Sequence, residues 1–145
     1  MPEKETLERA AEDKAEGKSP STQAGEFVRE EIEHIREGKH GARSTKQAIA
    51  IGLSKARRAG VKLPTPKKAS KKIREQAARD TRKGKTTGKK KSTRRSGATL
   101  SALKREGHSA ASKKALSRQA RTAAAKRSAA SRSRSAKKAA VTRKK

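Results

Sequence analysis

The sequence predicts a mostly disordered chain that contains one small all-α element, a helical hairpin, and a tail able to become helical when bound. Two observations predict the disorder: only 29% of the 145 residues are hydrophobic, and the formal net charge is +28. Such a chain buries too little apolar surface to offset the entropy lost on ordering. A third observation predicts the hairpin, because two capped, amphipathic helical patterns follow one another between residues 19 and 63.

The charge is unevenly distributed along the chain. Residues 1–37 carry 11 acidic and 6 basic side chains, residues 38–63 carry 7 basic and no acidic ones, and residues 64–145 carry 29 basic and 3 acidic ones. Blocks of like charge are typical of interaction segments. We therefore expect four parts: an acidic flexible arm (1–18), the hairpin (19–63), a basic linker rich in Pro, Gly, Ser and Thr (64–97), and a low-complexity basic tail of Ala, Ser, Lys and Arg (98–145).

The first helix of the hairpin has clear start and stop signals. Ser19 and Pro20 are suited to the N-cap and first helical positions, and Gly38 is suited to the end. Between them the apolar residues recur at helical spacing, at Ala24, Val28, Ile32 and Ile35.

The second helix is expected to begin at a capping box, Ser44 with Gln47, and to end near Ala59, with Gly60 as a left-handed cap. Ala48, Gly52 and Ala56 recur every four residues, so another helix can approach closely along this stripe. Ile51 falls on the opposite side and is expected to be exposed. Because a unit of this size is marginally stable alone, the hairpin is expected to be weakly stable or to gain stability by pairing with a partner or, as weak self-association, with a second copy.

The excess of cations predicts nucleic acid as the partner, bound through its phosphates with release of counterions. Single-strand binders stack bases on aromatic side chains, and Phe27 is the only aromatic residue, so duplex DNA is favoured. The predicted nucleic-acid-binding residues are basic positions in the hairpin, the linker and the tail: Arg43, Lys46, Lys55, Arg57, Arg58, Lys67, Lys68, Lys71, Lys72, Lys89, Lys90, Lys91, Arg94, Arg95, Lys113, Lys114, Arg118, Arg121, Lys126, Arg127, Lys137 and Lys138.

The turn from Gly41 to Lys46 sets two cations against a helix N-terminus, where a phosphate could dock, although ordinary capping explains the same residues. The three histidines, His34, His40 and His108, have no metal-binding spacing and no neighbouring cysteine, so neither a metal nor a cofactor is predicted. No nucleophile–base pair is evident, and the chain is expected not to be an enzyme. Four glutamates (Glu26, Glu30, Glu33 and Glu37) form an acidic stripe that is either solvated or docks the basic tail.

The run from Lys46 to Gly60, KQAIAIGLSKARRAG, resembles a family of small basic bacterial proteins that carry a domain of unknown function. The family pattern is KQAIAIGLSxARxAG, and the resemblance implies a bacterial protein without a known catalytic residue. The tail is similar in composition to the Lys/Ala/Ser-rich tails of linker histones and bacterial histone-like proteins.

These observations favour a histone-like, nucleoid-associated protein that binds duplex DNA with little sequence preference. Two alternatives remain open: an RNA-binding or ribosome-associated basic protein, and a stress or accessory protein whose hairpin binds a protein partner while the tail localises it. The charged N-terminus lacks a signal-peptide core, and no apolar run is of membrane-spanning length, so the expected location is cytoplasmic, at the nucleoid, with no membrane partner.

Overall fold

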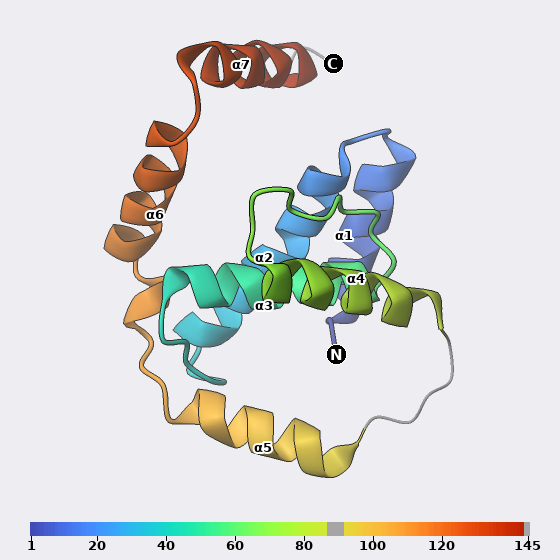
Figure 1. The fold of residues 1–145 in the computed structure, drawn as a ribbon, viewed down its shortest axis with the longest axis vertical. Helices are drawn as coiled ribbons and strands as arrows, with labels where there is room; N and C mark the ends of the chain where they lie inside the picture. The colour runs from blue at the N-terminus through green and yellow to red at the C-terminus, as the bar shows by residue number, and fades with distance from the viewer. Residues whose placement is uncertain (87–91, 144–145) are drawn as a thin grey trace.

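The computed structural model describes residues 1–86 and 92–143, and within these ranges it is all-α, with 73% of the chain helical and no strand. The prediction of a mostly disordered chain is therefore wrong (Figure 1). The elements in chain order are α1 (Lys4–Ala15), α2 (Pro20–Arg36), α3 (Thr45–Arg58), α4 (Lys71–Lys85), α5 (Thr93–Lys104), the 3₁₀ turn η1 (Ser109–Ala111), α6 (Lys113–Ala125) and α7 (Ala129–Arg143). No helix in the described ranges is both long and apolar enough to cross a bilayer.

Both helices of the predicted hairpin are present with their predicted caps. The Ser19 hydroxyl accepts from the Thr22 amide at the start of α2, and the Ser44 hydroxyl accepts from the Gln47 amide at the start of α3. Gly38 and Gly60 follow the two helices with positive φ angles of 76° and 95°. These conformations suit glycine because it has no Cβ to clash with the preceding turn.

The small-residue stripe of α3 packs against α2, as its spacing predicts. Ala48 and Ala56 are fully buried there. A Cβ atom on Gly52 would lie 2.7 Å from the Cα of Val28, so the two backbones are close enough that only glycine fits. Phe27 is 1% exposed and packs in a core cluster with Ala24 and Ala56.

The N-terminal segment, expected to be a flexible arm, forms α1 and packs on α2. Ala10 joins the cluster around Phe27, Thr6 is buried, and Arg9 Nε donates to Glu26 at 2.8 Å. The packing of α1 on α2 was not predicted from the sequence because the buried side chains of α1 are small or polar. They bury little apolar area, and the attachment depends on ion pairs with partners that lie far away in sequence.

Helix α4, expected to be part of a linker, covers the second face of α3. Ala77 and Asp80 are buried at this contact. The Asp80 carboxylate accepts from Ser54 Oγ at 2.7 Å and from Arg58 Nε at 2.8 Å. Ile51 is accordingly half-buried rather than exposed.

A short piece of the tail completes the core. Ala110 and Ala111 of η1 are buried against Ile32, Ile35 and Ala48, and Leu116 of α6 packs on the same cluster. Tertiary packing thus reaches into the segment that the sequence suggested was low-complexity and unordered.

Helices α5, α6 and α7 contain no buried side chain, although Leu116 of α6 is partly covered. Figure 1 shows α5 and α7 standing apart from the α1–α4 core, joined to it through η1 and α6. Serine caps at Ser92, Ser112 and Ser128 favour these helices, and alanine propensity adds to this in α6 and α7. The repulsion among their like charges, on which the expectation of disorder depended, does not prevent these helices.

Candidate nucleic-acid interface

Helix α6 presents one cationic face. Lys114, Arg118 and Arg121 follow each other at helical spacings of four and three residues, so they project from the same side. With Ser117 and Thr122 they line a shallow hollow of about 320 Å³. The Thr122 hydroxyl donates to the Arg118 carbonyl at 2.8 Å, so the cations and the Ser117 hydroxyl are the groups that suit an anion with several oxygen atoms.

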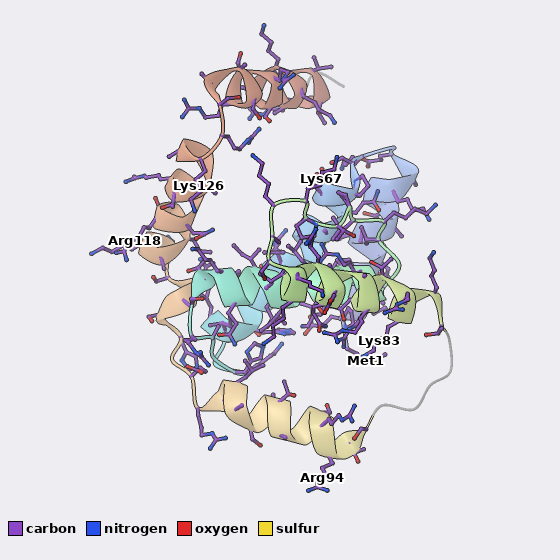
Figure 2. The ribbon with its side chains drawn as sticks, viewed as in Figure 1. Met1, Lys67, Lys83, Arg94, Arg118 and Lys126 are labelled. Carbon is purple, nitrogen blue, oxygen red and sulfur yellow. The ribbon has the colours of Figure 1, made fainter. Side chains whose placement is uncertain are left out.

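A second, adjoining hollow of about 460 Å³ lies where α6 meets η1 and the N-terminal end of α3. Arg118 and Thr122 line both hollows, so together the two form one open depression, which we call the basic groove. The second hollow is lined by Arg43, Ser44, Thr45, Lys46, Ser109, Ala110, Ala115, Arg118, Gln119 and Thr122. Figure 2 shows Arg118 on α6 and Arg94 on α5 extending outward from their helices.

Hydrogen bonds between distant segments fix the two walls of the basic groove. Thr45 Oγ1 donates to the Ala110 carbonyl at 2.7 Å, and the Ala42 amide donates to the Gly107 carbonyl at 3.0 Å. The Gly41 amide donates to the Leu103 carbonyl at 2.9 Å. A Cβ atom on Gly41 would lie 1.9 Å from the backbone oxygen of Glu106, so the contact requires glycine. The groove is therefore built by tertiary contacts and not by α6 alone.

The N-terminal end of α3 is capped in the ordinary way. Besides the Ser44 cap, the Gln47 side-chain oxygen accepts from the Arg43 amide at 2.8 Å. The Arg43 side chain is 81% exposed and lies 3.6 Å from the Glu106 carboxylate, the one acidic group paired with it. The capping interpretation of the Gly41–Lys46 turn is thus confirmed, while the remaining positive end of the helix still faces the groove.

Two of the predicted binding residues, Lys55 and Arg58, pair with carboxylates of the core, although the Arg58 side chain remains 48% exposed. Lys55 lies between Glu30 and Glu31 at 3.0 and 2.8 Å, and Arg58 pairs with Asp80 at 2.8 Å. Arg57 is half-buried. Lys55 and Arg57 are therefore less available to an external phosphate than the exposed cations are, and the ion pair with Asp80 occupies part of the Arg58 guanidinium.

The remaining predicted residues fall into two groups. Arg43, Lys46, Lys114, Arg118 and Arg121 meet at the basic groove. Those that are exposed elsewhere are Lys67, Lys68, Lys71, Lys72, Arg94, Arg95, Lys113, Lys126, Arg127, Lys137 and Lys138. Lys89, Lys90 and Lys91 lie outside the described residues.

The acidic stripe of α2 pairs with cations from the first half of the chain. Its ion pairs are Glu26 with Arg9, Glu30 with Lys55, Glu33 with Arg29, and Glu37 with Lys39. Docking of the basic tail on this stripe is not seen in residues 1–86 and 92–143. The cations of α6 and α7 consequently keep their charge for another partner.

Asp80 is the acidic group on which the α3–α4 contact depends. Burial disfavours its carboxylate, but hydrogen bonds from Ser54, Arg58 and Gln76 outweigh that cost and lower the pKa below the ordinary value of an aspartic acid. The ionised form is therefore the one that holds α4 in place.

One cluster in the structure has the residue types of a metal site. Glu31, His34 and His40 each offer a ligand atom, and these atoms lie within 4.8 Å of one another. The sequence spacing predicted no metal site. His34 lies in α2 and His40 lies in the turn after it, so the two come together only when that turn folds. His108 is exposed and is not a member of this cluster.

Residues 13–68 match a family of unknown function, DUF6496. The match includes the Lys46–Gly60 run but does not test that motif residue by residue, and it stops well before the basic tail. No curated protein and no solved structure matches the chain.

Proposed function

We propose that the protein is a histone-like, nucleoid-associated protein that binds duplex DNA with little sequence preference. The observation that carries the proposal is the charge of helices α6 and α7. Glu106 is the last acidic residue of the sequence, and the chain beyond it is strongly basic. Neither helix buries a side chain, so the cations stand exposed.

Neutralisation of phosphates by such cations releases condensed counterions, which favours binding without any reading of bases. The preference for duplex over single-stranded nucleic acid is supported by Phe27. It is the only aromatic residue and is 1% exposed, so it is unavailable for stacking on a base.

The basic groove would position the backbone of the DNA. Its cations come from two elements, Arg43 and Lys46 at the start of α3 and Arg118 on α6, which tertiary contacts hold in a fixed relation. Phosphate contacts of this kind set orientation and carry no sequence information. The cations of α7, which stands apart from the core, would contact further phosphates along the duplex.

Two triple variants with matched charge test the proposal. The groove variant carries Arg43→Gln, Lys46→Gln and Arg118→Gln, and the control carries Lys137→Gln, Lys138→Gln and Arg143→Gln in α7. Each loses three positive charges, and each should reduce the slope of log K against log salt by about 2.7 if all three cations contact phosphates. We expect the groove variant to lose more affinity at a fixed salt concentration, because its cations are preorganised.

Binding constants for duplex DNA, duplex RNA and single-stranded DNA, measured on the same preparations, decide among the ligands. Tighter binding of duplex RNA would replace the proposal with an RNA-binding function. Absence of measurable binding to any nucleic acid at about 50 mM salt would refute both, and would leave a protein partner as the function of the hairpin.

A further inference from the structure

A compact cluster of polar side chains lies at the C-terminal end of α2 and the turn that follows it. Glu31 is completely buried, His40 is buried, and His34 lies at the edge of the cluster with its side chain 13% exposed. The ligand atoms of the three residues lie within 4.8 Å of one another. Two imidazoles with one carboxylate form a ligand set that divalent transition ions prefer.

The hydrogen bonding of His40 leaves one ring nitrogen directed at Glu31. Its Nδ1 donates to the Gly41 carbonyl at 3.1 Å, and because a carbonyl only accepts, the hydrogen belongs on Nδ1. Nε2 then faces Glu31 Oε1 at 3.2 Å. On a neutral ring two lone pairs would oppose each other there, so the arrangement calls for a cation between them. Two ligands of a tetrahedral zinc ion lie about 3.3 Å apart, which matches this separation.

His34 is oriented in a similar way by a carboxylate. Its Nε2 lies 2.9 Å from Glu3 Oε1, so it donates to Glu3, and Nδ1, which lies 4.0 Å from Glu30 Oε1, is left for a ligand. A carboxylate or carbonyl that accepts from the second nitrogen of a histidine is the usual outer-sphere partner in zinc proteins, where it fixes the ring and raises its basicity. Both histidines here have such a partner, from α1 and from the turn after α2.

The carboxylate of Glu31 is not fully satisfied by its neighbours. Oε1 accepts no hydrogen bond within the described residues, whereas Oε2 is paired with Lys55 Nζ at 2.8 Å. Lys55 also neutralises Glu30, at 3.0 Å. One ammonium group therefore serves two buried carboxylates, and one negative charge remains. Oε1, on the His40 side, is the oxygen left for a metal ion.

We propose that Glu31 Oε1, His34 Nδ1 and His40 Nε2 bind a divalent transition ion of the zinc type, with water as the fourth ligand. Imidazole ligands select zinc over magnesium or calcium, which take oxygen ligands. The ligand atoms lie within 4.8 Å of one another, so they would draw together on binding the ion. The ion would tie α2 to the turn that begins at Gly38 and stabilise the folded chain. This site is independent of the proposed binding of DNA.

Titration of the full-length, nucleic-acid-free protein with Zn²⁺ tests the proposal, and Co²⁺ serves as an optical probe of tetrahedral coordination. The variants are His34→Gln and His40→Gln, with His108→Gln as the matched control outside the cluster. We expect one Zn²⁺ per chain, a higher unfolding temperature with Zn²⁺, and at least a 100-fold loss of affinity in either cluster variant. The control should bind as the wild type does. Glu3→Gln, which removes the carboxylate partner of His34 together with the exposed Glu3–Lys39 ion pair, should weaken binding about 10–100-fold.

His34→Gln keeps the test decisive should His40→Gln fail to fold, because His34 lies at the edge of the cluster. Absence of Zn²⁺ and Co²⁺ binding by the wild type would overturn the proposal and would leave a proton on His40 as the cation. Equal affinity in wild type, His34→Gln and His108→Gln would overturn it too, because the ion would then be bound elsewhere.

Discussion

The core formed by α1 to α4 and the segment α5 to α7 are both helical, but they are helical for different reasons. In the core, α2 and α3 are held together by buried alanines and by a backbone contact that only Gly52 permits. In α5 and α7 no side chain is buried, and alanine propensity and serine caps supply the order. Both regions are thus helical, but their expected stabilities differ widely, because tertiary burial, and not propensity, supplies most helical stability.

The largest expected effect follows from removing helices α6 and α7. A chain truncated after Ser112 keeps η1 and the core but loses 13 of the 42 basic residues and no acidic ones. With roughly 6–10 phosphate contacts, the full-length protein should lose about 10³–10⁵ in DNA affinity between 50 and 200 mM salt, and the truncated chain should lose far less. Fluorescence anisotropy across a salt series measures both slopes. Identical slopes would mean that the core alone binds the DNA.

Hydrogen exchange should separate the two regions next. Amides of α2 and α3 exchange only on global or near-global opening, which for a stability of about 5 kcal/mol slows exchange by roughly 10³–10⁴. Amides of α5 and α7 should be slowed only slightly, because an isolated helix of that length frays readily. Mass spectrometry on the free protein resolves these segments. Strong protection in α7 would show that it has a partner, such as a second copy of the chain.

A glycine-to-alanine substitution should lower stability in the core and raise helix stability in α5. Gly52→Ala places a Cβ 2.7 Å from the Val28 backbone and should destabilise the core by about 1–3 kcal/mol. Gly97→Ala, in α5, meets no atom within 4 Å and should favour the helix by about 0.5–1 kcal/mol. Thermal unfolding followed by circular dichroism compares the two. A neutral Gly52→Ala would show that α2 and α3 can separate at low cost.

The smallest expected effect is a loss of stability at acidic pH, caused by protonation of Asp80 at the contact between α3 and α4. Because the folded-state pKa of Asp80 is lowered, its contribution to stability is complete above the ordinary aspartate pKa of about 3.9 and is lost as the pH falls through the folded-state value. The wild type should therefore lose more stability below about pH 4 than Asp80→Asn does. Denaturant unfolding at a series of pH values measures the difference, and parallel curves would exclude Asp80 as the titrating group.

The α2–α3 hairpin could be predicted from the sequence alone, because the signals that specify it act between residues close together in the chain. Caps such as Ser19 and Ser44 act within one helical turn, and the small stripe around Gly52 is a periodic pattern that needs no knowledge of the partner. The excess of exposed cations was likewise evident from composition. The expected disorder was wrong because composition measures average burial, whereas a few alanines such as Ala110 and Ala111 can be placed where burial is complete.

Only the tertiary structure decided the rest. The basic groove joins Lys46 to Arg118, and the Glu31 cluster joins His34 to His40 and Glu3, through contacts between residues that no local pattern relates. The attachments of α1 and α4 depend on ion pairs, and any of the 42 cations could have met any of the 14 carboxylates. Which of them pair is fixed by how the helices pack, since the Coulomb attraction is long-ranged and unselective until burial removes the water around a particular pair.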